Sequence, residues 1–97
     1  MGSSDLDEST VLKISKGMEL RKESYGSFVF DRVHRKVVTL NEIAVKVLEL
    51  CDGSHTVGEI ITMVKSENPG AESEFIENFM LDFLKKSVEE GLIEVIS

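Results

Sequence analysis

Alternating apolar and polar positions dominate the first third of the chain and predict short β-strands. Apolar and polar residues alternate within Val11–Ile14 and again within residues 18–21, which is the period-two pattern of half-buried strands. Phe28-Val29-Phe30 is rich in strand-forming residues, and Lys36–Leu40 has the length and composition of a third short strand. The pattern predicts a three-stranded antiparallel meander, with Val11–Ile14 as an additional strand or an arm.

The pattern changes to helical spacing at Asn41. Asn41 is a good N-cap for a first helix, although Thr39 and Glu42 also match a capping box, in which two side chains bond the free backbone N–H groups. We expect Asp52-Gly53 to end this helix, because glycine takes the left-handed conformation at a helix end without steric cost. Thr56 and Glu59 form a second capping-box match and predict the start of a second helix.

A third helix is expected from about Ser73 to Glu90, ended by Gly91 and followed by a short strand over 92–96. At about 100° per residue, Phe75, Phe79 and Phe83 lie close together on one side, and Met80 continues the apolar surface. The apolar arc spans roughly 240°, well above the width that one core contact needs. Either the sheet and the first two helices cover this arc, or its aromatic side lines a groove for a partner.

The stretch LELCDGSHTVGEII (48–61) gathers the residue types of a reactive site, but their spacing argues against one. A metal site needs three or four converging ligands, and Gly53 is expected to break the helix between Cys51 and His55. A lone cysteine near a helix end is most often a small buried hydrophobe. His55 is placed in the loop between two helices. We therefore predict no enzyme activity, no metal and no cofactor.

Composition and charge narrow the class of protein further. The 97 residues suit one small domain, and 18 acidic against 11 basic residues give a net charge of −7, which argues against a nucleic-acid partner. Apolar runs are too short to span a membrane, and the polar start has no secretory signature. We expect residues 1–10 to be a disordered tail, residues 11–97 to be the folded domain, and the protein to be cytoplasmic.

A family resemblance follows from several of these segments together. The run VVTLNEIAVKVLELCDGSHTVGEIITMV (37–64), then NPG (68–70), the phenylalanine-rich helix and EEGLI (89–93), resembles the PqqD family. These are peptide chaperones of pyrroloquinoline quinone (PQQ) biosynthesis, and they belong to the wider class of recognition elements for ribosomally synthesised and post-translationally modified peptides (RiPPs). The matching positions are Leu40, Asn41, Ala44, Leu48, Leu50, Asp52, Gly53, Thr56, Val57, Glu59 and Ile60.

The resemblance implies an α+β, winged helix-turn-helix-like domain, with an N-terminal three-stranded antiparallel sheet followed by three helices. It also implies a non-enzymatic module that captures the leader of a precursor peptide and presents it to a modifying enzyme, often a radical-SAM protein. The leader would add as a strand along the third strand of the sheet, beside the third helix. The peptide-binding residues would then be Lys36, Val37, Val38, Thr39, Leu40, Phe75, Phe79, Met80 and Phe83.

Two other functions remain open from the sequence. A winged-helix DNA-binding regulator would need Arg, Lys, Asn or Gln near the start of its recognition helix. The second and third helices instead begin TVGEIITMV and SEFIENFM, which are apolar and acidic. The third possibility is a protein-interaction or dimerisation module without a peptide ligand.

Overall fold

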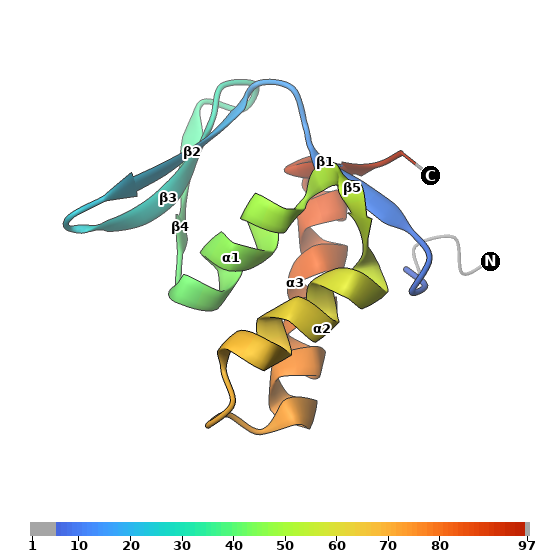
Figure 1. Ribbon diagram of the computed structural model, residues 1–97. Coiled ribbons are helices and arrows are strands. Elements are labelled where there is room, and N and C mark those ends of the chain that lie inside the picture. The colour runs from blue at the N-terminus through green and yellow to red at the C-terminus, as the bar shows by residue number, and fades with distance from the viewer. Residues whose placement is uncertain (1–5, 97) are drawn as a thin grey trace.

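The computed structural model describes residues 6–96 and has an α+β architecture of three helices and two antiparallel sheets (Figure 1). The three helices and the antiparallel strands agree with the predicted fold class. In chain order the elements are β1 (Val11–Ile14), β2 (Met18–Glu23), β3 (Gly26–Asp31), β4 (Lys36–Leu40), α1 (Glu42–Leu50), β5 (Asp52–Thr56), α2 (Val57–Glu67), α3 (Ser73–Glu89) and β6 (Ile93–Val95). No helix within residues 6–96 is both long and apolar enough to cross a membrane.

The first sheet is the meander β2-β3-β4, with β3 in the centre. Its register pairs Val29 with Leu20 on one side and with Val38 on the other. Because side chains alternate between the two faces of a strand, these three residues share the face that packs on the core. Figure 1 shows this sheet standing to one side of the three helices.

The second sheet has the order β5-β1-β6, so Val11–Ile14 is its central strand. The strand β6 pairs Ile93 with Ile14, which returns the end of the chain to its beginning. The strand β5 is a correction, because the sequence placed residues 52–56 in a loop containing His55. These residues are poor strand formers, but β1 offers them an edge, and Val11 pairs with Thr56 across it.

The predicted disordered tail covers residues 1–10, of which residues 1–5 lie outside the described residues. Residues 6–10 differ from the prediction, because they are ordered. They form a turn whose carbonyls cover the start of α2. The Val57 N–H donates to the Thr10 carbonyl at 2.8 Å, and the Gly58 N–H donates to the Glu8 carbonyl at 3.0 Å. The first N–H groups of a helix have no partner within the helix, so this turn satisfies two of them. A side chain at Gly58 would meet Glu8 at 3.2 Å, which explains the glycine there.

Both predicted helix starts have a side-chain cap. The Ala44 N–H donates to Oδ1 of Asn41 at 2.8 Å, so Asn41 is the N-cap of α1, and the alternative start at Thr39 is not used. At α2 the capping box is complete. The Glu59 N–H donates to Thr56 Oγ1 at 3.1 Å, and the Thr56 N–H donates to Glu59 Oε1 at 2.9 Å.

The long helix α3 carries much of the core. Its residues Ile76, Met80 and Leu84 are fully buried, together with Leu12 of β1 and Ile60 of α2. These five residues come from one sheet and two helices, and Val29 of β3 joins the same buried cluster from the other sheet, so one continuous core connects both sheets and the helices. The helix ends at Glu89 with Glu90 as its C-cap, and Gly91 takes a positive φ of 83° as the chain turns into β6.

The turn between β3 and β4 is built around the buried carboxylate of Asp31. One carboxylate oxygen accepts hydrogen bonds from the Val33 and His34 N–H groups at 3.0 and 2.9 Å, and the other lies 2.8 Å from His34 Nδ1. Burial acts to raise the pKa of Asp31, but the bonds from His34 and Val33 outweigh it and hold the pKa below 3.8. The charged form of Asp31 is therefore the form that the turn binds.

The hydrogen-bonded carboxylate of Asp31 predicts that the protein loses folding stability in acid. A carboxyl whose pKa is lowered by folding stabilises the protein above its unfolded pKa, and that contribution disappears as pH falls through the folded value. We expect the free energy of unfolding to fall as pH drops below about 4, and Asp31→Asn to reduce this fall, measured by urea denaturation at several pH values. Glu94→Gln, which removes an exposed carboxylate of β6 far from this turn in the sequence, is the matched control. An unaltered profile in Asp31→Asn would show that the turn does not contribute.

The capping box predicts a local stability effect. Thr56→Ala removes the acceptor for the Glu59 N–H and should lower the free energy of unfolding by about 1 kcal/mol. Thr62→Ala, at an exposed position in the middle of α2, is the matched control. Thermal unfolding followed by circular dichroism compares the two, and equal melting temperatures would contradict the role given to the cap.

Candidate functional site

The strand β4 forms an outer edge of the β2-β3-β4 sheet. It pairs with β3 along one side, from Lys36 opposite Asp31 to Leu40 opposite Ser27. Within residues 6–96, no backbone hydrogen bond joins its other side to another segment. Unpaired N–H and C=O groups on an edge strand are ready to pair with a further strand.

The two faces of β4 differ as the alternation predicts. Val38 and Leu40 are partly buried and pack against the core, whereas Val37 is 56% exposed and Thr39 is exposed. Lys36 is exposed but lies on the same face as Val38, since side chains two positions apart share a face. A strand added to β4 would therefore present alternate side chains toward the helices.

The phenylalanines of α3 line one flank of its buried face. Phe79 and Phe83 stack in parallel, with ring centroids 6.0 Å apart and an interplanar angle of 8°, and both are partly buried. Phe75, one turn earlier, is 61% exposed. The aromatic flank is thus only partly covered by the core, which favours the groove over complete coverage.

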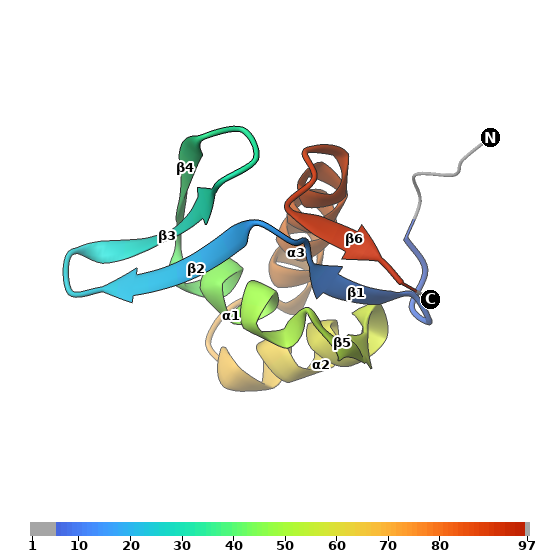
Figure 2. The same ribbon diagram turned by 90° about the horizontal axis from the view of Figure 1, so that it is seen from above.

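This flank faces away from α2. Lys65 of α2 pairs with Glu77 of α3 at 3.0 Å, which fixes the side of α3 that faces α2. Glu77 lies about 160° around the helix axis from Phe79 at 100° per residue. Figure 2 shows β4 and α3 on the same side of the molecule, opposite α2. The aromatic flank and the free edge of β4 therefore belong to one side of the protein.

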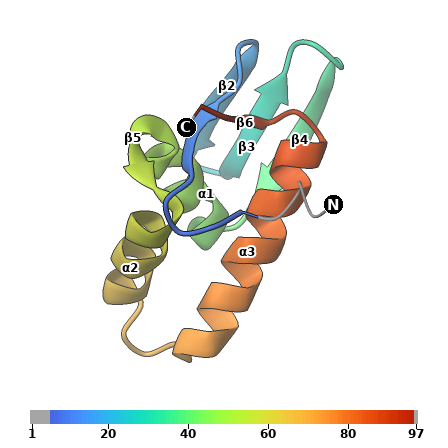
Figure 3. The same ribbon diagram turned by 90° about the vertical axis from the view of Figure 1, so that its right-hand side faces the viewer.

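The structure separates the predicted site residues into two groups. The strand β4 lies level with the C-terminal half of α3, which carries Phe83, and not with the half that carries Phe75 (Figure 3). Met80 is a correction, because it is fully buried and cannot line a surface groove. It occupies the centre of the buried face of α3, and helical spacing alone did not show how far around α3 the core extends.

The cluster around Cys51 has no reactive arrangement. Burial, with a smaller contribution from the charge of Asp52, raises the pKa of Cys51 to about 12, so the thiol is protonated at neutral pH. His55 Nδ1 lies 3.0 Å from an Asp52 oxygen rather than beside the sulfur. In the part of the chain that the structure describes, no three His, Cys, Asp or Glu side chains are grouped as metal ligands.

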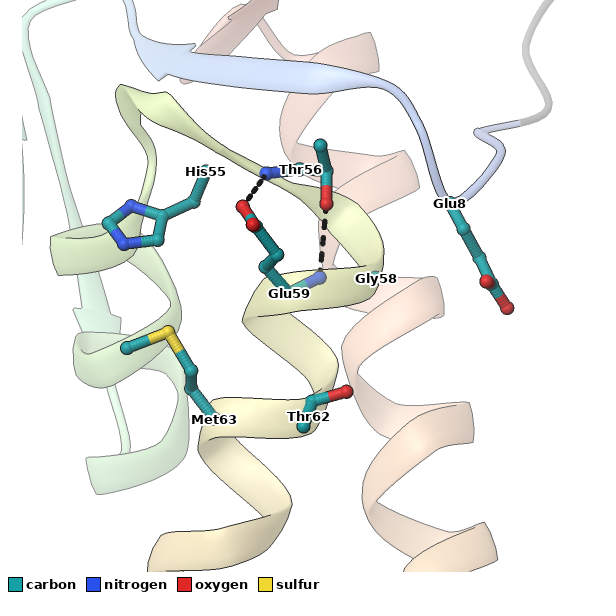
Figure 4. Close-up of a pocket in the computed structure, with 7 residues that line it drawn as sticks. All are labelled: Glu8, His55, Thr56, Gly58, Glu59, Thr62 and Met63. Atoms are coloured by element: carbon teal, nitrogen blue, oxygen red, sulfur yellow. Dashed lines mark hydrogen bonds between the residues drawn. The ribbon is translucent and has the colours of Figure 1, made fainter.

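Two pockets were not predicted from the sequence. One lies at the start of α2, lined by Glu8, His55, Thr56, Gly58, Glu59, Thr62 and Met63 (Figure 4). Three of its polar side chains are already engaged, Thr56 and Glu59 with each other's backbone in the capping box and His55 with Asp52. The turn at residues 6–10 builds one wall of this pocket, and its polar sequence gave no signal of an ordered contact.

The second pocket lies where β4 ends and α1 begins. It is lined by Lys22, Glu23, Ser24, Gly26, Ser27, Leu40, Asn41, Glu42 and Val45. Leu40 is its one lining residue from β4, and the residues from 22 to 27 belong to the β2-β3 hairpin, so the hollow lies on the β3 side of β4 and not along the free edge. The residues that line it come from two distant stretches of the chain, which only the meander brings together.

These features define a small binding domain with an open strand edge beside an aromatic helix flank. The family model described as Coenzyme PQQ synthesis protein D (PqqD) matches residues 24–93, and the chain belongs to this family. The resemblance noted in the sequence is thereby confirmed. Family membership also agrees with the prediction that the protein is not an enzyme.

A solved structure shares the fold. It is the solution NMR structure of the PqqD truncation of Methylobacterium extorquens PqqCD, described as a functional and stand-alone RiPP recognition element. The two chains are 24% identical, with a TM-score of 0.74, and the match covers 97% of this chain and 99% of that one. No curated protein sequence gives a significant match.

Burial predicts losses of stability of very different size for two residues of α3. Met80→Ala should lower the free energy of unfolding by about 2–5 kcal/mol, because it leaves a cavity in the core. Phe75→Ala should change it by no more than about 0.5 kcal/mol, because the ring is largely exposed. Urea denaturation measures both, and a large loss in Phe75→Ala would show that this ring is part of the core.

Proposed function

We propose that the protein is a peptide-binding module that captures the leader of a ribosomally made precursor peptide along β4. The observation that supports this most directly is the free edge of β4 beside the partly exposed aromatic flank of α3. The leader pairs its backbone with Lys36–Leu40, and its alternate side chains contact Phe79 and Phe83. Backbone pairing gives affinity in this binding mode, and the side-chain contacts give specificity.

The same proposal assigns roles to the other elements. The pair α1 and α2 forms the helix-turn-helix part of a winged-helix-like arrangement, and the β2-β3-β4 sheet takes the place of the wing. The module presents the bound precursor to a modifying enzyme in the cytoplasm, with a radical-SAM protein as the proposed partner. PQQ biosynthesis is the pathway that the family description suggests.

A titration tests the proposed binding surface. The ¹⁵N-labelled protein is titrated with the leader encoded beside it, and we expect the amide signals of Lys36–Leu40 and of α3 to shift. Amide hydrogen exchange of β4 should slow in the complex, because an added strand bonds the free edge. Binding that leaves both β4 and α3 unperturbed would overturn the proposal.

The aromatic flank can be tested by substitution. Phe79→Ala should weaken leader binding about tenfold, because buried aromatic contacts carry much of the affinity of an interface. Phe79→Leu keeps an apolar side chain in place and should retain the fold with an intermediate affinity. Tyr25→Ala is the matched control, because Tyr25 is 80% exposed in the turn between β2 and β3, away from this flank. Equal affinities for wild type and Phe79→Ala would remove α3 from the site.

A further inference from the structure

The turn that leads into β4 carries a concentration of positive charge that the peptide-binding proposal does not use. Residues 32–36 contain Arg32, Arg35 and Lys36 and no acidic residue, although the chain as a whole has a net charge of −7. Arg32 is engaged, since its guanidinium bonds Glu19 at 2.6 Å and lies 6.0 Å from the Phe30 ring centroid. Arg35 and Lys36 are exposed and form no ion pair with any residue in 6–96.

Nearby acidic groups do not neutralise these two cations. Asp31 is opposite Lys36 in the sheet, but its carboxylate is occupied by Val33 and His34. The last turn of α3 adds Lys86, Glu89 and the adjacent Glu90 to this end of the site, and none of them pairs with Arg35 or Lys36 within the described residues. Figure 2 shows that the turn leans from the sheet toward α3, so its charges lie at one end of the free edge.

The backbone of Arg35 supplies an independent observation. Arg35 has a φ of 56° and is the one residue other than glycine with a positive φ in the described chain. This left-handed conformation favours glycine and is costly for a side chain with a Cβ. An arginine here therefore costs stability where a glycine would relieve strain, and no side-chain hydrogen bond or ion pair of Arg35 within residues 6–96 offsets that cost. Backbone strain of this kind is found most often at functional sites.

From the charge and the strain together, we infer that the peptide bound along β4 carries acidic side chains where it passes this turn, and that Arg35 and Lys36 bind them. The inference rests on the proposed function and names the chemistry of its ligand. Every strand pair in residues 6–96 is antiparallel, and a strand added to β4 in the same way ends where β4 begins, so its acidic residues follow its apolar ones. The opposite end of the edge offers Asn41 and the acidic Glu42 instead, which disfavour acidic residues there.

A peptide selection tests this without knowledge of the natural ligand. The full chain is immobilised and exposed to a displayed library of random peptides long enough to pair with all of β4. We expect enriched peptides with apolar residues at alternate positions, followed toward the C-terminus by Asp or Glu. Enrichment of no peptide would overturn the proposed function itself. Enrichment of peptides on β4 without an acidic preference would leave that function standing and overturn the inference.

Two substitutions distinguish a loss of affinity caused by the missing charge from one caused by lower folding stability. Arg35→Gly removes the charge and relieves the strain, so the melting temperature should be equal to or higher than that of wild type. Its affinity for an enriched acidic peptide should nevertheless fall roughly two- to fivefold, as should that of Lys36→Gln. Lys13→Gln, at an exposed lysine of β1, is the matched control. Affinities are measured by fluorescence anisotropy at low and high salt, and the losses should shrink as salt screens the charges.

Paramagnetic broadening of amide signals measures the direction in which the peptide lies along β4. A nitroxide placed at the C-terminus of an enriched peptide should broaden the amide signals of Arg35 and Lys36, and one placed at the N-terminus should broaden those of Leu40 and Asn41. The reverse pattern, or unchanged affinity in both charge variants, would overturn the inference. So would binding of a labelled nucleic-acid duplex that is lost in Arg35→Gly and outcompetes the acidic peptide.

Discussion

The pairing of β1 on both of its sides is the constraint on which the rest of the structure depends. On one side the Ile14 N–H donates to the Cys51 carbonyl, and on the other the Ser15 N–H donates to the Leu92 carbonyl, both at 3.0 Å. A four-residue strand thus ties the segment between α1 and α2 to the end of α3. Because β2 begins only four residues after β1 ends, the same pairing fixes where the first sheet stands relative to the helices. The position of β4 beside α3 follows from it.

The parts of the fold that sequence predicts well are those set by local chemistry. The length and composition of Lys36–Leu40 identified β4 with its observed bounds. Asn41 and the pair Thr56–Glu59 marked two helix starts, because capping depends on residues within one turn. The long apolar arc of α3 predicted a helix with more than one contact surface, and its exposed aromatic flank is the part that the core leaves over.

What the sequence could not supply is set by contacts between distant segments. Apart from Thr56, the residues of β5 are poor strand formers, and they become a strand because β1 lies beside them, which is a tertiary effect. Residues 6–10 are polar and small, yet they cover the start of α2 with their carbonyls. Met80 and Phe79 are neighbours on an apolar helix, and only the packing of β1 and α2 decides that one is buried and the other partly exposed. Candidate site residues on α3 therefore required the structure.

The pairing of β1 with β6 decides on which side of the domain another protein could be joined to it. Residues near both ends of the described chain lie by the β5-β1-β6 sheet, and β4 stands on the far side of the helices from them (Figure 1). A polypeptide extended from either end would leave the domain away from the open edge. A domain joined at either end would therefore leave the edge of β4 uncovered.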